Sequence, residues 1–389
     1  MQKALLDGIL SVHKLRWATS RQYSINVDLF SPGIYKEPEN LLSMKPSYSR
    51  PTVLSRYFFA SLLFPLVLLS GAPLTRAQDQ DDVIRTETNL VQLNVGVVDP
   101  QGRAITSLSQ NDFTVYEDGV KQRILHFDPA NAPFSLVLLL DVSGSTLSFR
   151  PQFKQAALRF LDALAPEDRV SVIQFNEKVK LLTGFTTDRE KTGYAIDKRA
   201  DGAGETHFFE ALKYALTELD KEGKQRRKAI VVLTDGLDTQ LRNLDRPLLA
   251  KAQNDQEAIA AIDPKASNAL NAVLTAADRQ GVSIFPLALP SGDPKRLPLP
   301  DPVINGIYYA ARARLQILAD RTGGRLNDIQ RLDQMARLYA EVAAELRTLY
   351  TVAYQPAGER ARTGKWHEIK IEVGHPELIV RTRPGYFAR

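Results

Sequence analysis

The chain has 389 residues, of which 44% are hydrophobic and 24% are charged, a balance typical of a globular protein with more than one domain. It contains no cysteine, so disulfides, thiolate metal sites and cysteine nucleophiles are excluded. The net charge of +5 lies in the first 77 residues, and the remaining chain holds 41 basic and 41 acidic residues. This neutral body argues against nucleic acid as a partner.

Residues 1–77 predict a leader with a signal peptide. A basic residue precedes an apolar core over residues 57–70, and small residues stand at positions −3 and −1 of a cleavage site before Gln78. We interpret Met44, which opens a short basic segment, as the true start of translation. The alternative is an uncleaved membrane anchor, because residues 57–74 are uncharged over 18 positions. Either interpretation predicts export, to the periplasm, the cell surface or the medium.

Residues 83–132 predict an N-terminal β segment. Leu90–Asp99 alternates apolar and polar side chains with a period of two, as a half-buried strand does. Asp112–Phe127 predicts a hairpin that turns at Glu117-Asp118-Gly119. No helical pattern separates these strands, so we expect them to pair in antiparallel fashion.

Residues 133–330 predict an α/β domain, because apolar runs typical of buried strands alternate with amphipathic helical patterns. The expected strands are Leu136–Leu140, Val170–Phe175, Ala229–Leu233 and Val282–Leu289. Four helices are expected. The first carries an apolar face made of Phe153, Ala157, Phe160, Leu161 and Leu164, and the second follows Thr206. The third spans Asn268–Gln280, and the fourth lies around Leu315–Arg321. This alternation predicts a doubly wound, mostly parallel sheet covered on both faces.

The chain after residue 330 predicts one more helix, over residues 331–348, and then a C-terminal β segment, over residues 349–389. We expect this segment to pair with residues 83–132 in a β-sandwich-like domain that flanks the α/β domain. Two separate small β units are the alternative. The sequence shows no internal repeat.

Oxygen-bearing side chains stand where three expected strands or loops end. Asp141, Ser143 and Ser145 follow the first strand of the α/β domain, Thr206 precedes a helix, and Asp235 follows another strand. In doubly wound sheets, ligands bind where strands end and loops diverge. Two carboxylates and three hydroxyls on separate loops can surround a small hard cation such as Mg²⁺, which prefers about six oxygen ligands.

The D-x-S-x-S motif after an apolar strand, a threonine roughly 60 residues later and a strand-ending T-D-G resemble the metal-ion-dependent adhesion site of the von Willebrand factor type A domain. The resemblance spans about residues 133–324. The wider frame, from DFTVYEDG to the RPGYF ending, is similar to the VWFA-related family of exported bacterial proteins, which are common in acidobacteria. The resemblance implies a Rossmann-like fold and Mg²⁺, with Mn²⁺ or Ca²⁺ as alternatives.

By this likeness, the metal ligands are Asp141, Ser143, Ser145 and Thr206, with Asp235 in contact directly or through water. Such a site, with few carboxylates, favours an anionic further ligand, so we expect a protein partner that supplies an acidic side chain. We expect neither nucleic acid nor nucleotide as a partner, and membrane contact only through an uncleaved leader. The protein is therefore interpreted as an adhesion-type binding module and not as an enzyme.

Other interpretations of the same residues stay open. Asp141 and Ser143 could be turn or capping residues, and Asp238 is interpreted as a cap. A structural or assembly factor of the bacterial envelope, with an optional or vestigial metal site, is the alternative function. A serine hydrolase is more distant, because G-x-S-x-G is absent and His207 is the sole nearby base. The basic run at residues 224–228 is interpreted as a solvated loop.

Overall fold

A computed structural model describes residues 90–223, 226–290, 301–356 and 364–388. These residues belong to one compact unit, Asp82–Arg389. The predicted leader and the proposed start at Met44 lie outside the described residues. No helix in the described ranges is long and apolar enough to cross a membrane.

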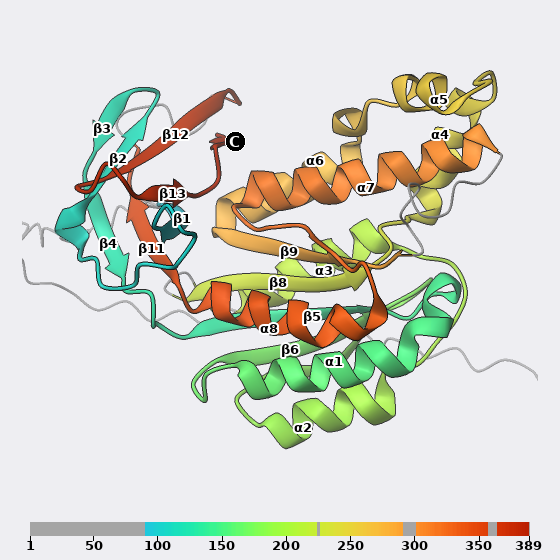
Figure 1. Ribbon diagram of the computed structural model, residues 1–389, viewed down its shortest axis with the longest axis horizontal. Helices are drawn as coiled ribbons and strands as arrows, with labels where there is room; N and C mark the ends of the chain where they lie inside the picture. Colours follow the sequence, from blue (N-terminus) through green and yellow to red (C-terminus); the bar gives the residue numbers. More distant parts are fainter. Residues whose placement is uncertain (1–89, 224–225, 291–300, 357–363, 389) are drawn as a thin grey trace, which may run out of the picture. The chain divides into compact units, whose positions relative to one another are not determined.

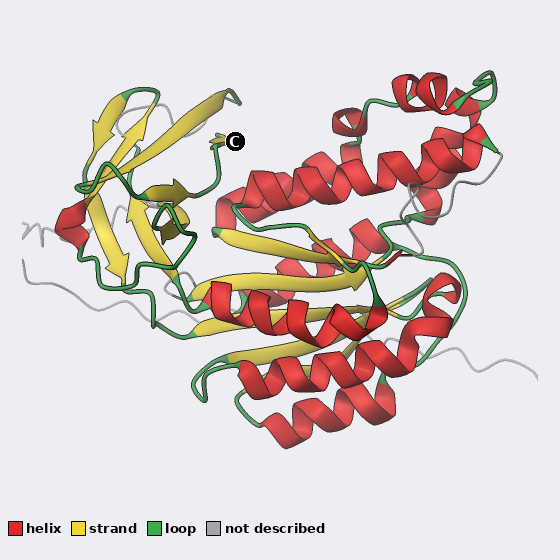
Figure 2. Cartoon of the chain, viewed as in Figure 1, coloured by secondary structure: helices red, strands yellow, loops and turns green. Residues whose placement is uncertain are grey.

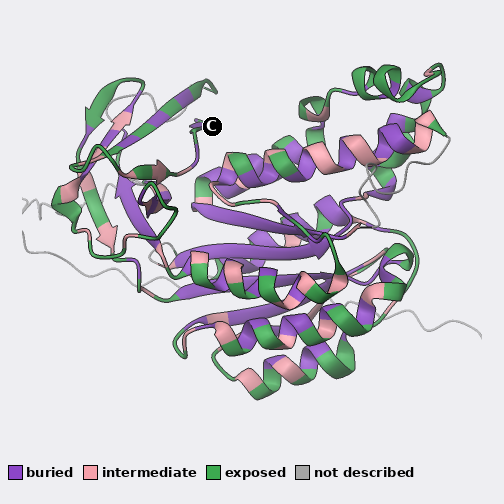
Figure 3. Cartoon of the chain, viewed as in Figure 1, coloured by how far each residue is buried: buried purple, intermediate pink, exposed green. Residues whose placement is uncertain are grey.

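A six-stranded sheet forms the centre of the α/β part, with the strand order β10-β9-β8-β5-β6-β7. All neighbouring strands are parallel except β6 and β7. The inner strands are continuous apolar runs because both of their faces are buried, as Figure 3 shows. The strands are β5 (Phe134–Asp141), β6 (Arg169–Phe175), β7 (Val179–Thr186), β8 (Arg227–Thr234), β9 (Val282–Ala288) and β10 (Asn327–Asp328).

Helices cover both faces of this sheet, which gives three layers (Figure 2). One face packs against α1 and α8, and the other packs against α3, α6 and α7. The predicted doubly wound, mostly parallel α/β fold is confirmed. The helices are α1 (Arg150–Ala163), α2 (Arg189–Tyr194), α3 (Phe208–Asp220), α4 (Thr239–Leu249), α5 (Asp255–Ala261), α6 (Asn268–Gln280), α7 (Pro302–Thr322) and α8 (Met335–Leu346).

Two four-stranded antiparallel sheets are built from strands near both ends of the described chain. Their orders are β13-β1-β11-β4 and β14-β12-β2-β3, so each sheet contains strands from before and after the α/β part. Apolar side chains from both sheets form one core, among them Leu93, Val115, Val352 and Ile371. The strands are β1 (Val91–Val98), β2 (Phe113–Glu117), β3 (Val120–Gln122), β4 (Ile124–Asp128), β11 (Leu349–Tyr354), β12 (Trp366–Val373), β13 (Ile379–Arg381) and β14 (Gly385–Phe387).

Buried polar contacts join the antiparallel sheets to the α/β part. The Asn94 side chain on β1 donates to the Gly281 carbonyl (3.2 Å) and to Ser283 Oγ (3.0 Å). Gly281 ends α6 in the left-handed region at φ 66°, and a Cβ there would lie 2.8 Å from Gln92 Cβ. Glycine is therefore required both by the helix cap and by the close approach of β1.

The prediction of a solvated loop is wrong for the basic run's last two residues. Arg227 and Lys228 open β8 and are 1% and 2% exposed. The Arg227 guanidinium donates to five backbone carbonyls, those of Pro129, Ala130, Ala132, Leu346 and Leu349. These hydrogen bonds offset the cost of burying the charge of Arg227. They also link β8 to the end of α8 and to the chain before β5.

Candidate metal centre

The two acidic residues of the predicted site lie at the C-terminal edge of the sheet. Asp141 is the last residue of β5, and Asp235 directly follows β8. The two strands are parallel neighbours in which Leu140 pairs with Leu233, so both carboxylates emerge at the same level. Their exposed fractions are 1% and 0%. Two carboxylates thus lie in one buried place, as the sequence predicts.

Hydrogen bonds hold the Asp141 carboxylate in one orientation. Its Oδ1 accepts from the Ser143 backbone N–H at 3.0 Å, and its Oδ2 accepts from Thr234 Oγ1 at 2.7 Å. Thr146 Oγ1 donates to the Asp141 carbonyl at 2.9 Å and thereby closes the turn after β5. The carboxylate is therefore positioned before any ligand binds.

The serine pair lies in the loop that follows β5. Ser143 precedes a 3₁₀ turn over Gly144–Phe149, and Ser143 Oγ lies 3.2 Å from Ser145 Oγ. Ser143 is buried, whereas Ser145 is exposed. Burial raises the pKa of the Asp235 carboxyl, and the nearby Ser145 hydroxyl opposes this rise. The loop therefore turns both hydroxyls toward the carboxylate pair.

The Thr206 loop docks against this serine loop. The Gly144 N–H donates to the Gly204 carbonyl at 3.1 Å, two residues before Thr206. Thr206 N–H donates to Thr239 Oγ1 (3.1 Å), and Thr239 N–H donates to the Thr206 carbonyl (2.8 Å). Thr206 is buried at the entry to α3. The structure thus brings the three predicted loops together at one edge of the sheet.

Burial makes the charged forms of the Asp141 and Asp235 carboxylates unfavourable. Burial raises the pKa of Asp141 to about 7, and the charge of Asp235 adds to this effect. Burial also raises the pKa of Asp235, against which Arg312 acts weakly. Asp235 Oδ2 is buried and has no hydrogen-bond partner among the described residues. A buried acidic oxygen without a donor fits a cation at this position.

The other residues weighed from the sequence have different surroundings. Asp238 caps α4 by accepting from the Leu241 N–H at 3.0 Å, as predicted. The His207 imidazole lies 3.4 Å from Glu210 and 3.9 Å from Glu205, which is 60% exposed. Among the described residues, His207 therefore contacts these two carboxylates and makes no hydrogen bond with Ser143.

The sequence did not indicate the residues that orient the candidate site residues. Thr234 holds Asp141, and Thr239 holds the Thr206 loop. Burial raises the pKa of Asp235, and the charge of Arg312 on α7 opposes this rise weakly. Thr234 could have been found, because it directly precedes Asp235 in the T-D-G motif. The other two carry no local sequence signal, because tertiary packing alone brings them to the site.

Comparison with known proteins gives a class for this fold and site. Residues 136–237 match the von Willebrand factor type A domain family. An uncharacterized protein of Synechocystis sp. is 37% identical over 109 residues, which are 27% of this chain and 25% of that protein. The match therefore spans about a quarter of that relative's length.

Two solved structures are similar at low sequence identity. A von Willebrand factor type A protein from Catenulispora acidiphila is 11% identical, with a TM-score of 0.41 over 78% of this chain and 74% of that chain. Proximal thread matrix protein 1 from the mussel byssus, with a zinc-occupied metal-ion-dependent adhesion site, is 14% identical, with a TM-score of 0.40 over 58% of this chain and 48% of that chain.

The chain contains a von Willebrand factor type A domain. Domains of this class commonly mediate protein–protein interactions and bind a divalent metal at the edge of the sheet.

Proposed function

We propose that the protein is an exported protein-binding module, and that Asp141, Ser143, Ser145, Thr206 and Asp235 hold a divalent cation through which it engages its partner. The observation that carries this proposal is the buried Oδ2 atom of Asp235, which has no hydrogen-bond partner among the described residues and lies beside a second buried carboxylate. An all-oxygen ligand set favours Mg²⁺, with Mn²⁺ or Ca²⁺ as alternatives.

The chemistry of the ligands supports an acidic partner group. Five side chains supply at most five of the roughly six oxygen ligands that Mg²⁺ prefers, so a carboxylate from outside can take the open position. The rim around the site is open to such a group, because Gly144, Ser145 and Glu205 are exposed. When bound, the cation supplies a positive, coordinatively open point at the protein surface.

The residues of this chain then act as a receptor and not as a catalyst. Thr234 and the Ser143 N–H orient the Asp141 carboxylate, and Thr239 holds the Thr206 loop through the Thr206 N–H. The His207 imidazole lies 3.4 Å from Glu210 and 3.9 Å from Glu205, and no hydrogen bond among the described residues joins it to Ser143 as a general base would require. An envelope scaffold that uses the same fold without needing the metal is the second candidate.

A peptide-display selection tests the proposed function. A random peptide library is panned on the immobilised chain in Mg²⁺ and eluted with EDTA, beside the variant Ser143→Ala. The matched control is Ser148→Ala, which removes an exposed hydroxyl from the same loop. We expect eluted peptides to share an Asp or Glu that is required for binding, and Ser143→Ala alone to lose them. Peptides that bind equally in EDTA would favour the scaffold interpretation.

A further inference from the structure

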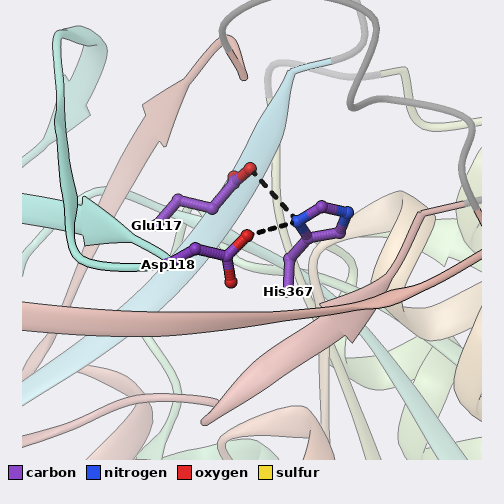
Figure 4. Close-up of side chains that lie close together, drawn as sticks. All are labelled: Glu117, Asp118 and His367. Carbon is purple, nitrogen blue, oxygen red and sulfur yellow. Dashed lines mark hydrogen bonds and ion pairs between the residues drawn. The ribbon is translucent and has the colours of Figure 1, made fainter.

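A second group of metal-ligating side chains lies in the antiparallel sheets, and the sequence-based reasoning did not single it out. Glu117 ends β2, Asp118 follows it in the tight turn before β3, and His367 lies on β12 (Figure 4). Strands β2 and β12 are antiparallel neighbours in which Glu117 pairs with Ile369. His367 therefore meets the adjacent Glu117 and Asp118, although it lies 249 positions after Asp118 in the sequence.

The distances suit one small ion. His367 Nδ1 lies 2.8 Å from Asp118 Oδ2 and 3.7 Å from Glu117 Oε1, and the three ligand atoms lie within 4.8 Å of one another. Neighbouring ligands of a tetrahedral ion with bonds of 2.0–2.1 Å are roughly 3.3 Å apart. The two separations from His367 Nδ1 bracket this value. The carboxylate oxygens of Glu117 and Asp118 lie within 4.8 Å of each other, so they would move closer together around a bound ion.

Glu117 supplies an independent indication of a ligand. Its side chain is fully buried, and its Oε1 atom has no hydrogen-bond partner among the described residues, although it points toward His367. The other oxygen, Oε2, accepts from the hydroxyls of Tyr354 (2.6 Å) and Tyr386 (3.1 Å). A buried carboxylate is thus held by two donors on one oxygen while the second oxygen faces the imidazole.

The surroundings hold the other two ligands in place. The Asp118 backbone adopts a positive φ of 50°, and its Oδ1 accepts from the Glu368 N–H at 2.9 Å, so its Oδ2 is turned toward the imidazole. The His367 ring stacks on Tyr386 with 5.5 Å between centroids. Such outer contacts orient metal ligands and raise affinity.

We propose that Glu117, Asp118 and His367 form a second divalent-metal site, specific for a first-row transition ion of the Zn²⁺ class and separate from the site at the edge of the parallel sheet. An imidazole nitrogen combined with carboxylates favours Zn²⁺ over Mg²⁺. Two carboxylates and a neutral imidazole balance the ion's charge, and the ion replaces the proton that His367 Nδ1 and Asp118 Oδ2 otherwise share.

The position of this site indicates a structural role with a path of entry. Asp118 is 39% exposed, whereas the side chains of His367 and Glu117 are 6% and 0% exposed, so an ion enters from the turn and a water completes its coordination. The ion would join the turn between β2 and β3 to β12, and therefore join the N-terminal to the C-terminal strands. Binding to the folded state alone raises its stability.

The test uses Co²⁺, whose visible absorption reports nitrogen and oxygen ligation, and Zn²⁺ as its competitor. Titrations are made on the Asp141→Ala variant, in which the site at the sheet edge is removed. We expect one equivalent of Co²⁺ with a tetrahedral spectrum, displaced by Zn²⁺ but not by excess Mg²⁺. We also expect saturating Zn²⁺ to raise the melting temperature of this variant by several degrees.

Two variants and one matched control assign the ligands. Adding His367→Gln or the more exposed Asp118→Asn to Asp141→Ala should abolish the Co²⁺ spectrum and the Zn²⁺ shift. Adding His126→Gln, which removes another imidazole that lies 3.1 Å from an aspartate, should change neither. Absence of any Co²⁺ or Zn²⁺ binding in Asp141→Ala, or a spectrum that survives Asp118→Asn, overturns the proposal and assigns the cluster to a proton-bridged ion pair.

Discussion

Replacing Arg227 with methionine should destabilise the protein strongly. The guanidinium donates to five backbone carbonyls and lies 4.0 Å above the Phe134 ring. Three of these bonds, to Ala130, Leu346 and Leu349, lie in buried surroundings. Methionine retains the apolar stem but leaves those three carbonyls without their donor.

The expected loss follows from the cost of an unsatisfied buried acceptor, about 1–3 kcal/mol each. Removal of the cation also removes the cost of burying it, since burial lowers the pKa of Arg227 to about 10. We therefore use the lower value for each of the three buried carbonyls and expect a loss of about 3 kcal/mol. At about 2–4 °C per kcal/mol, the melting temperature should fall by roughly 6–12 °C.

Differential scanning calorimetry checks this value, with Arg226→Met as the control. Arg226 is the adjacent arginine, is 33% exposed and donates to Ser135 Oγ at 2.8 Å. Its replacement should lower the melting temperature by only a degree or two. Two results would contradict the proposal that buried hydrogen bonds of Arg227 link β8 to α8. One is an equal effect of the two substitutions, and the other is a fall in melting temperature of less than about 3 °C for Arg227→Met.

Two further substitutions test the packing and the site. Gly324→Ala should lower the free energy of unfolding by about 3 kcal/mol or more, because its Cβ would lie 2.0 Å from the Ile284 carbonyl oxygen. Gly184→Ala is the control, because its Cβ meets open space, and a urea titration should show a far smaller loss. Thr234→Val should weaken Mg²⁺ binding about 10–100-fold by releasing Asp141 Oδ2. It should also lower the melting temperature in EDTA, because the buried Asp141 Oδ2 loses its donor and the buried Gly236 N–H loses its acceptor. Unchanged Mg²⁺ affinity would exclude this orienting role.

The parallel sheet was predictable because its strands carry their own signal. Leu136–Leu140 and Ala229–Leu233 are apolar without alternation, which only a strand buried on both faces requires. The helix ends were predictable where caps are local, as at Gly281 after α6. The predicted helix around Leu315–Arg321 is shorter than the observed one, since α7 begins at Pro302.

For the candidate centre, the sequence predicts the residues that stand at strand ends but not the contacts that orient them. Asp141 and Asp235 stand at strand ends, a position that sequence reveals. The partners that orient them depend on which strands become neighbours, and β7, α4 and α5 were not foreseen at all. Arg227 shows the same limit. A basic run in the sequence indicates an exposed loop, and only the folded structure reveals the five carbonyls from distant segments that surround the Arg227 guanidinium. The cluster around Glu117 likewise depends on the pairing of β2 with β12.

The measurement that tests the central claim most directly is the melting temperature of the chain in EDTA and in excess Mg²⁺, for the parent, Asp141→Asn and His367→Gln. Mg²⁺ at about 100 times its dissociation constant adds about 2.7 kcal/mol. The parent and His367→Gln should therefore melt roughly 5–10 °C higher in Mg²⁺. Asp141→Asn should melt no lower than the parent in EDTA, because a buried carboxylate repulsion is removed, and should not respond to Mg²⁺. A parent protein that Mg²⁺ leaves unchanged, or an equal shift in Asp141→Asn, would contradict a cation site at the edge of the sheet.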